Sequence, residues 1–366
     1  MFEKPRLKAC YNVSRIDSKL VFLLSEHRHQ VLFGKAHFLL ANLLDGTRTV
    51  SNIMEQLGSR LSAPQILKSL QDLEKRGYTC ESAGETAVEH AAFWDYLETP
   101  AGNAQVNLKN AEISVRTAGN ADPSRITQIL EQFGARITPN GKYLAVATDD
   151  YLRPELAEIN RECVENRRPW FPFKDKGVSV WAGPLFVPGK TACLECMAHR
   201  LRGNRQVEGY IVKRNGLDWP QAVARAAIPP SEQIASSLAA LQVVKWIGSG
   251  MANCCSELVV LDVNSLDLTK HTVVKRPQCP VCGTETGQQK VPSPLKLSES
   301  RKRFKSKDGH RSVSPAATWK KYRHHISPLT GVVGSFVSKE TSPDGLTHSY
   351  AAGHAFPMLS DNIYDL

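Results

Sequence analysis

Two Cys-x-x-Cys pairs are the residues whose type and spacing most directly indicate chemistry. One pair is Cys193 and Cys196 in "TACLECMAHR", and the other is Cys279 and Cys282 in "RPQCPVCGTE". Four thiolates supplied as two close pairs, each on a tight turn, are typical of tetrahedral zinc. Because four thiolates complete the coordination shell, no position stays open for a substrate. The pattern therefore predicts a structural zinc ion.

A disulfide and a redox centre are the other uses of such pairs. The N-terminal "MFEKPRLKAC" has neither a long apolar run nor a cleavage-site pattern, and no stretch approaches the ~20 apolar residues of a spanning helix. We therefore expect a cytoplasmic protein without a membrane partner, and structural disulfides are rare in that compartment. A thioredoxin-type pair must sit at a helix N-terminus, which makes redox chemistry a weaker hypothesis than zinc.

The charge of the chain favours an acidic partner. The 366 residues carry a net charge of +10, concentrated in "RKRFKSKDGHR" (Arg301–Arg311) and "KKYRHH" (Lys320–His325). A nucleic acid, a phosphate ligand and an acidic peptide all fit such a balance. Composition alone does not choose among them.

The first eighty residues predict a small module of strands followed by helices. Short β-rich runs at Tyr11–Asp17, Leu20–Glu26 and His29–Gly34 indicate a three-stranded antiparallel meander. Three helices are expected next: a short apolar one at Ala36–Leu44, and amphipathic ones at Thr49–Leu57 and about Ser62–Arg76, the last with capping-box spacing. Such an order is typical of a winged-helix-like module.

DNA binding is the common function of that module, and peptide capture is the alternative. A recognition helix should be basic, but the third helix mixes Lys68, Lys75 and Arg76 with Asp72. An exposed strand edge beside a helix can instead accept an extended peptide as one more strand. We expect that edge in "HQVLFG", with Val31, Leu32 and Phe33 along the strand and Lys68, Asp72, Lys75 and Arg76 on the helix as peptide-binding residues.

The middle of the chain predicts an open α/β sheet. Residues 84–110 are interpreted as a connector, after which strands and helices alternate from Glu112 onward. The first strand–helix turn, "VRTAGNADPSR", keeps only Gly119, so it lacks a glycine-rich phosphate loop. We expect no ordinary nucleotide site there. The helix after Cys196 adds His199, Arg200, Arg202 and Arg205, which predict a solvated face or an anion contact.

Three stretches together resemble the cyclodehydratases that form thiazoline and oxazoline rings in cyanobactin-type ribosomal peptides, also called heterocyclases. They are "PLFVPGKTACLECMAHRLRGNRQVE", "KRPQCPVCG" and "SPLTGVVGSF" with "HSYAAGHAF". The resemblance implies a leader-peptide recognition element of PqqD type over residues 1–83, a ThiF-like zinc domain over 84–300, and the start of a YcaO domain over 301–366. It also implies a homodimer through the ThiF-like domain.

The resemblance assigns ATP and Mg²⁺ to YcaO motifs that are not present in this sequence. We therefore expect no catalytic residues here, and activity only in a complete enzyme or with a separate YcaO chain. The favoured hypothesis is the leader-binding and scaffold part of an azoline-forming cyclodehydratase, with a ribosomal precursor peptide as partner. The alternatives are a ThiF-like adenylating enzyme acting on a peptide or sulfur carrier, and a winged-helix nucleic-acid binder.

Overall fold

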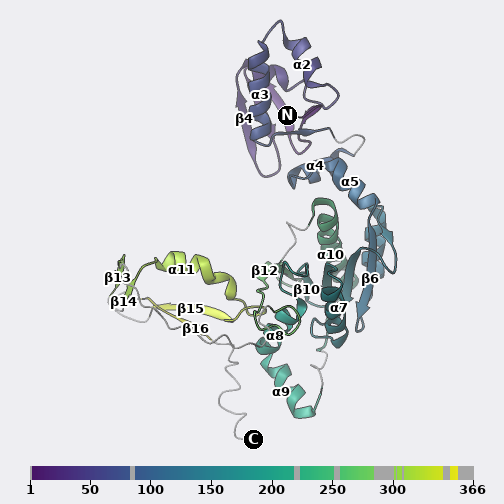
Figure 1. The fold of residues 1–366 in the computed structure, drawn as a ribbon, viewed down its shortest axis with the longest axis vertical. Coiled ribbons are helices and arrows are strands. Elements are labelled where there is room, and N and C mark those ends of the chain that lie inside the picture. Colours follow the sequence, from purple (N-terminus) through teal and green to yellow (C-terminus); the bar gives the residue numbers. More distant parts are fainter. Residues whose placement is uncertain are drawn as a thin grey trace. The chain divides into compact units, whose positions relative to one another are not determined.

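The computed structural model describes residues 2–82, 87–217, 223–250, 256–283, 301, 303–306, 309–340 and 347–352. The chain divides into two compact units (Figure 1). The first contains Met1–Ala111 with Ile247–Gly250, and the second contains Glu112–Trp246 with Met251–Leu366. Each unit has its own hydrophobic core.

The strands of the first unit confirm the predicted meander. β2 (Asn12–Ile16), β3 (Leu20–Leu24) and β4 (His29–Phe33) form an antiparallel sheet in the order β2-β3-β4. β4 therefore has one strand neighbour within the described residues, and its other side is a sheet edge. β1 (Pro5–Leu7) and β5 (Thr79–Glu81) pair in a second sheet that was not predicted, because three residues are too few to show a strand period.

Three helices pack on this sheet as predicted. They are α1 (Lys35–Leu40), α2 (Val50–Leu57) and α3 (Ala63–Lys75). The capping box of α3 forms, since the Gln65 side chain accepts the Ser62 amide at 2.9 Å. The shared core consists of side chains that are at most 5% exposed, among them Val21, Leu23, Leu32, Ile53, Leu57, Ile66, Leu70 and Leu73.

The predicted connector is wrong, because the chain forms two further helices there. They are α4 (Val88–Tyr96) and α5 (Ala101–Lys109), and both belong to the first unit. Apolar residues are spread around these helices without a single stripe, so the periodicity that identifies amphipathic helices is weak.

A buried carboxylate joins α4 to the N-terminal strand. Asp95 is 3% exposed and accepts bonds from the Arg6 guanidinium at 2.7 and 3.1 Å and from the Ala9 amide at 2.7 Å. The Cys80 thiol points at the same carboxylate at 3.5 Å, and burial followed by the charge of Asp95 raises the pKa of Cys80 to about 12. The cysteine is therefore a neutral core residue.

The second unit is built on a mixed seven-stranded sheet. Its strands are β6 (Glu112–Ala118), β7 (Arg136–Ile137), β8 (Tyr143–Thr148), β9 (Trp170–Lys174), β10 (Ser179–Ala182), β11 (Glu257–Asp262) and β12 (Leu268–Thr272). The order is β12-β11-β10-β9-β8-β6-β7. Pairs β7–β6, β6–β8 and β8–β9 are parallel, and the pairs from β9 to β12 are antiparallel. The parallel half carries the strand–helix alternation read from the sequence.

The chain that forms this sheet also forms helices, which are α6 (Ser124–Gln132), α7 (Pro154–Glu165), α8 (Leu194–Asn204), α9 (Gln206–Asn215) and α10 (Pro229–Ser249). α6 follows β6 and α7 follows β8 in the chain, which is the alternation of strands and helices that the sequence predicts. None of the described helices is long and apolar enough to cross a membrane.

The C-terminal segment adds short elements. β13 (Phe304–Ser306) pairs with β14 (Gly309–Arg311), and β15 (Ser335–Glu340) pairs with β16 (Thr347–Ala352). Between the pairs lie α11 (Pro315–Tyr322) and a 3₁₀ turn at Arg323–His325. Parts of two predicted domains lie outside the described residues: 84–86, 218–222, 251–255 and 284–300 of the zinc domain, and 302, 307–308, 341–346 and 353–366 of the YcaO segment.

Replacing Asp95 tests the attachment of α4. Asp95→Ala leaves the buried Arg6 charge unpaired, so we expect a loss of about 3–5 kcal/mol in the free energy of unfolding. Urea unfolding of the full chain measures the change. The exposed Glu89→Gln on the same helix is the matched control and should cost less than about 0.5 kcal/mol. Equal losses in both variants would contradict the assignment.

Candidate metal centre and peptide-binding edge

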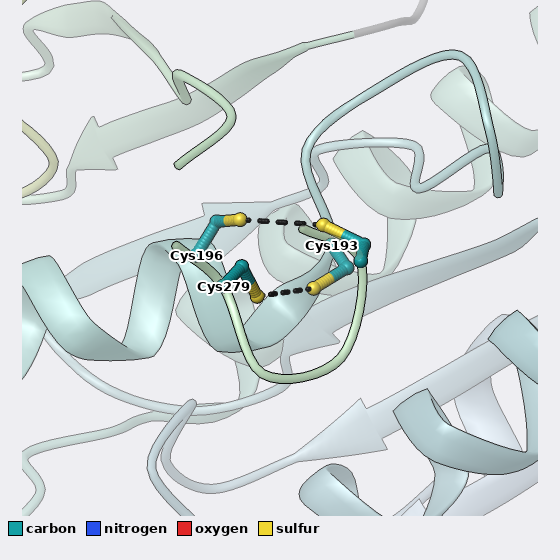
Figure 2. Close-up of side chains that lie close together, drawn as sticks. Cys193, Cys196 and Cys279 are labelled. Atoms are coloured by element: carbon teal, nitrogen blue, oxygen red, sulfur yellow. Dashed lines mark hydrogen bonds between the residues drawn. The ribbon is translucent and has the colours of Figure 1, made fainter. Parts of the chain in front are cut away.

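The four predicted cysteines come together at one point of the second unit. The sulfurs of Cys193, Cys196, Cys279 and Cys282 all lie within 4.8 Å of one another, with 3.6 Å between Cys193 and Cys279 and 3.5 Å between Cys196 and Cys282. Figure 2 shows the labelled side chains converging from two segments. A tetrahedron with Zn–S bonds of about 2.3 Å has sulfur–sulfur edges of about 3.8 Å. The sulfur arrangement fits a four-coordinate metal ion.

Two tight turns place these sulfurs. The Cys196 amide donates to the Cys193 carbonyl at 3.1 Å, and the Gly283 amide donates to the Cys279 carbonyl at 2.8 Å. A Cβ added at Gly283 would lie 2.4 Å from the Cys279 carbonyl oxygen, so only glycine permits the second turn. The Cys-x-x-Cys spacing seen in the sequence thus forms two tight turns, each of which carries two sulfurs.

The surroundings of the sulfurs favour a thiolate. A hydrogen bond from Cys193, assisted by the Arg276 amide at 3.3 Å, lowers the pKa of Cys196 below that of an ordinary thiol. The same hydrogen bond and burial raise the pKa of Cys193. Three of the four cysteines are buried. A buried group of thiols with one ionised member is suited to hold a cation, which supplies the missing positive charge.

Protein carboxylates occupy the strand–helix turn after β6. The Asn120 amide donates to Asp149 at 3.1 Å, and the Asp122 amide donates to Asp175 at 2.9 Å. A Cβ added at Gly119 would lie 2.4 Å from atoms of both Asp149 and Arg153. Amides that cradle a phosphate in other sheets of this kind are therefore directed at carboxylates here.

Charges at the carboxyl ends of β8 and β9 reinforce that arrangement. Burial opposes ionisation of Asp149, but bonds from Arg153 and the Asn120 amide and the nearby Arg225 hold its pKa at about 2. Burial lowers the pKa of the Lys174 ammonium, which lies over the Trp181 ring, to about 8. Asp149 is thus an anion bound by protein cations at neutral pH.

The basic residues after Cys196 have separate surroundings. Arg202 pairs with Glu195 at 2.9 Å, and Arg205 pairs with Asp150 at 2.8 Å. Both arginines line a cavity of about 370 Å³ between α7, α8 and α9. Burial and the charges of Arg276 and Arg200 lower the pKa of His199.

The edge of β4 presents alternate backbone groups. Gly34 donates to the Lys19 carbonyl at 2.7 Å, and β4 pairs with β3 in the register Leu32↔Val21. Because hydrogen-bonded pairs alternate in an antiparallel ladder, Leu32 bonds to β3, whereas the amides of Val31 and Phe33 point to the open edge. The side chains alternate as well, since Leu32 is 2% exposed and Phe33 is 71% exposed.

α3 is linked to the end of this edge through His37 of α1. Lys68, Lys75 and Arg76 lie on its polar side, and Arg76 donates to Asp72 at 3.1 Å. Asp72 also lies 3.7 Å from His37 of α1, which in turn bonds to the Phe33 carbonyl at 2.8 Å. Sequence reasoning missed His37, because a lone histidine in a short helix gives no signal of where its ring points.

Both units of the chain match known proteins. Residues 6–81 match a family model described as a winged helix-turn-helix domain. A solved structure described as a heterocyclase in complex with substrate and cofactor is 35% identical, with a TM-score of 0.78 over 93% of this chain. The heterocyclase TruD is 34% identical, with a TM-score of 0.77 over 90% of this chain.

The chain resembles the heterocyclases. It spans about half of their length, since the matches cover 47% and 49% of those two chains. E. coli MccB with ATP shares the fold, with a TM-score of 0.56 and 15% identity over 76% of this chain and 99% of its own. Protein HesA of Leptolyngbya boryana is 29% identical over 153 residues, which are 40% of this chain and 49% of HesA.

These findings confirm the predicted fold class and the predicted resemblance. A winged-helix unit precedes a mixed α/β sheet, as the sequence indicated. The cysteines are brought together as expected for a metal ion. The peptide-binding roles of the residues on β4 and α3, the zinc-ligand roles and the domain boundaries at 83/84 and 300/301 stay predictions.

The filled turn after β6 generates a test with ATP. Because its amides already bind Asp149 and Asp175, we expect no ATP binding with a Kd below about 1 mM and no ATP–pyrophosphate exchange. Isothermal titration of the full chain with Mg-ATP measures the affinity. Micromolar binding by the wild-type chain would contradict this expectation and would show that ATP can displace the carboxylates from the turn.

Proposed function

We propose that this chain is the leader-binding and scaffold part of an ATP-dependent cyclodehydratase. The complete enzyme would convert Cys, Ser or Thr residues of a ribosomal precursor peptide into thiazoline or oxazoline rings. The observation that carries the proposal is the open edge of β4 beside α3, in a chain 35% identical to a heterocyclase solved with its substrate. The chain's part in the reaction would be to hold the leader of that peptide.

The reaction assigned to the complete enzyme defines what a scaffold must do. A substrate thiol or hydroxyl attacks the preceding peptide carbonyl, ATP phosphorylates the resulting oxyanion, and phosphate leaves as the amide nitrogen loses its proton and the C=N bond forms. We assign ATP and Mg²⁺ to a YcaO domain, continuous with this chain or on a separate one. Holding the leader raises the effective concentration of the core peptide at that domain.

Backbone hydrogen bonds would supply most of the leader's attachment. The open groups of Val31 and Phe33 form the ladder, and side chains between β4 and α3 select among sequences. Lys68 and Lys75 attract acidic leader residues, which raises the association rate more than the affinity. A nucleic-acid role is disfavoured, because Asp72 neutralises Arg76 on the helix that would have to contact phosphates.

We also propose that the four-cysteine centre holds a structural zinc ion. Four sulfur ligands close the coordination shell, and structural zinc contributes directly to the free energy of folding. The ion would therefore stabilise the second unit and take no part in a chemical step.

A homodimer through the second unit and a separate YcaO chain belong to the same proposal. The resemblance to heterocyclases that are about twice as long supports a missing catalytic part. Sedimentation of the full chain, alone and mixed with YcaO proteins encoded nearby, tests both associations.

Proline substitutions test the strand-addition model. Val31→Pro removes an amide that faces the open edge, so we expect leader binding to fall at least tenfold while the fold is kept. The probe is the fluorescein-labelled leader of the precursor reading frame beside this gene, measured by anisotropy with the full chain.

Leu32→Pro is the control for that experiment. It removes an amide that bonds to β3, so it should lower the melting temperature of the first unit. Unchanged leader affinity in a folded Val31→Pro protein would rule out the β4 edge. A leader that binds nowhere on the wild-type chain would overturn the function itself.

Loss of one cysteine tests the zinc centre. Cys279→Ser should lower the zinc content from about one per chain and destabilise the second unit, because a four-thiolate site loses one of its ligands. Plasma emission spectrometry and thermal unfolding give the two readouts.

Cys163→Ser is the matched variant for the zinc centre, because Cys163 is a buried cysteine outside the cluster. It should keep the full zinc content. Burial raises the pKa of Cys163 to about 11, so this thiol stays protonated and is a poor metal ligand at neutral pH. A Cys279→Ser protein that keeps one zinc, or a chelated wild type that melts unchanged, would contradict the proposal.

A further inference from the structure

A histidine stands at one end of the open edge of β4. His37 lies in the short helix α1, and its Nδ1 is 2.8 Å from the Phe33 carbonyl oxygen. Its Nε2 is 3.7 Å from a carboxylate oxygen of Asp72 on α3. One imidazole ring therefore bridges the last residue of the edge strand and the helix beside it.

The contacts of the ring determine its tautomer. A carbonyl oxygen only accepts, so Nδ1 carries a hydrogen and donates it to Phe33. In the neutral ring Nε2 then has a lone pair. Nε2 is buried, and it has no hydrogen-bond partner among the described residues. The ring is thus held between the Phe33 carbonyl and the Asp72 carboxylate.

The bond to Phe33 changes what the edge offers to an incoming strand. The alternation fixed by Gly34 and Lys19 directs the Phe33 carbonyl away from β3, toward the open edge. His37 already occupies that carbonyl. The groups open to a peptide are the N–H and C=O of His29 and Val31 and the N–H of Phe33. The row of open backbone groups along β4 therefore ends at the N–H of Phe33.

We infer that His37 ends the peptide ladder at Phe33 and fixes the register of the bound leader. This inference rests on the proposed function, and it makes His37 a positioning residue. The leader strand would pair with His29, Val31 and the N–H of Phe33 and end there, because the ring already binds the Phe33 carbonyl. The recognised segment is therefore a short strand-forming stretch with one fixed end, and residues beyond the ring add no backbone bond.

Selection from a library tests the inference on the full chain. Random twelve-residue peptides are displayed on messenger RNA and panned against the wild type, against His37→Asn and against His37→Ala. The Asn amide can still donate to the Phe33 carbonyl, whereas Ala cannot. We expect wild-type and His37→Asn binders to share one alignment and one end of the strand-forming stretch, and His37→Ala binders to extend that stretch past Phe33.

Truncation of a selected peptide measures the register. Residues beyond the ring should be removable without effect on the Kd of the wild type. In His37→Ala the freed Phe33 carbonyl accepts one more bond, so the same truncation should weaken binding about 2- to 10-fold. If His37→Ala unfolds, His37→Gln replaces it, because the longer Gln amide does not coincide with Nδ1.

The outcomes separate this inference from the function on which it rests. Binders that are lost in Val31→Pro but show the same alignment and truncation profile in all His37 variants would overturn the role of His37 alone. A wild-type chain that enriches no peptide, or binders insensitive to Val31→Pro, would overturn the β4 edge as a peptide site and with it this inference.

Discussion

Four sulfurs that converge from two segments bring distant parts of the second unit to one point. Cys193 and Cys279 are separated by 86 residues of chain, yet their sulfurs lie 3.6 Å apart. Thiolates at this distance would repel one another without a cation between them. The proposed zinc ion would therefore stabilise an arrangement that the surrounding core also supports. This arrangement places the start of α8 against the turn after β12, and the surrounding core includes residues of both sheet halves.

The sheet of the second unit shows that a shared fold does not by itself imply a shared ligand site. This chain shares its fold with E. coli MccB solved with ATP. At the carboxyl ends of the parallel strands, however, protein carboxylates occupy the amides of the first turn, and Arg153 and Arg225 surround Asp149. Folding has already removed these charged groups from water and paired them. A phosphate would therefore have to displace the carboxylates before it could reach the amides. Fold likeness alone therefore does not transfer the nucleotide site.

The first unit is organised around the opposite condition, a backbone edge left open. Exposed strand edges invite nonspecific pairing, and proteins usually limit them. Here the edge is short, it carries the exposed Phe33, and a histidine closes one end. Such an edge can accept a peptide while limiting how far a foreign strand can extend along it. The helix beside it supplies the polar groups that distinguish one peptide from another.

Local features of this protein could be predicted from the order of its residues, whereas the contacts between elements could not. Period-2 runs indicated the meander, the Ser62 capping box indicated α3, and two Cys-x-x-Cys pairs indicated the ligands of the metal centre, because each signal lies within a short stretch of chain. α4 and α5 were not predicted, since their apolar residues do not form one stripe and Asp95 binds partners more than eighty residues away. That Val31 and Phe33 face the open edge, that His37 touches both this edge and α3, and that Asp149 fills the turn after β6 became visible only with the folded chain. These contacts join residues on different elements, and side-chain direction there is set by packing and backbone geometry that no local pattern encodes.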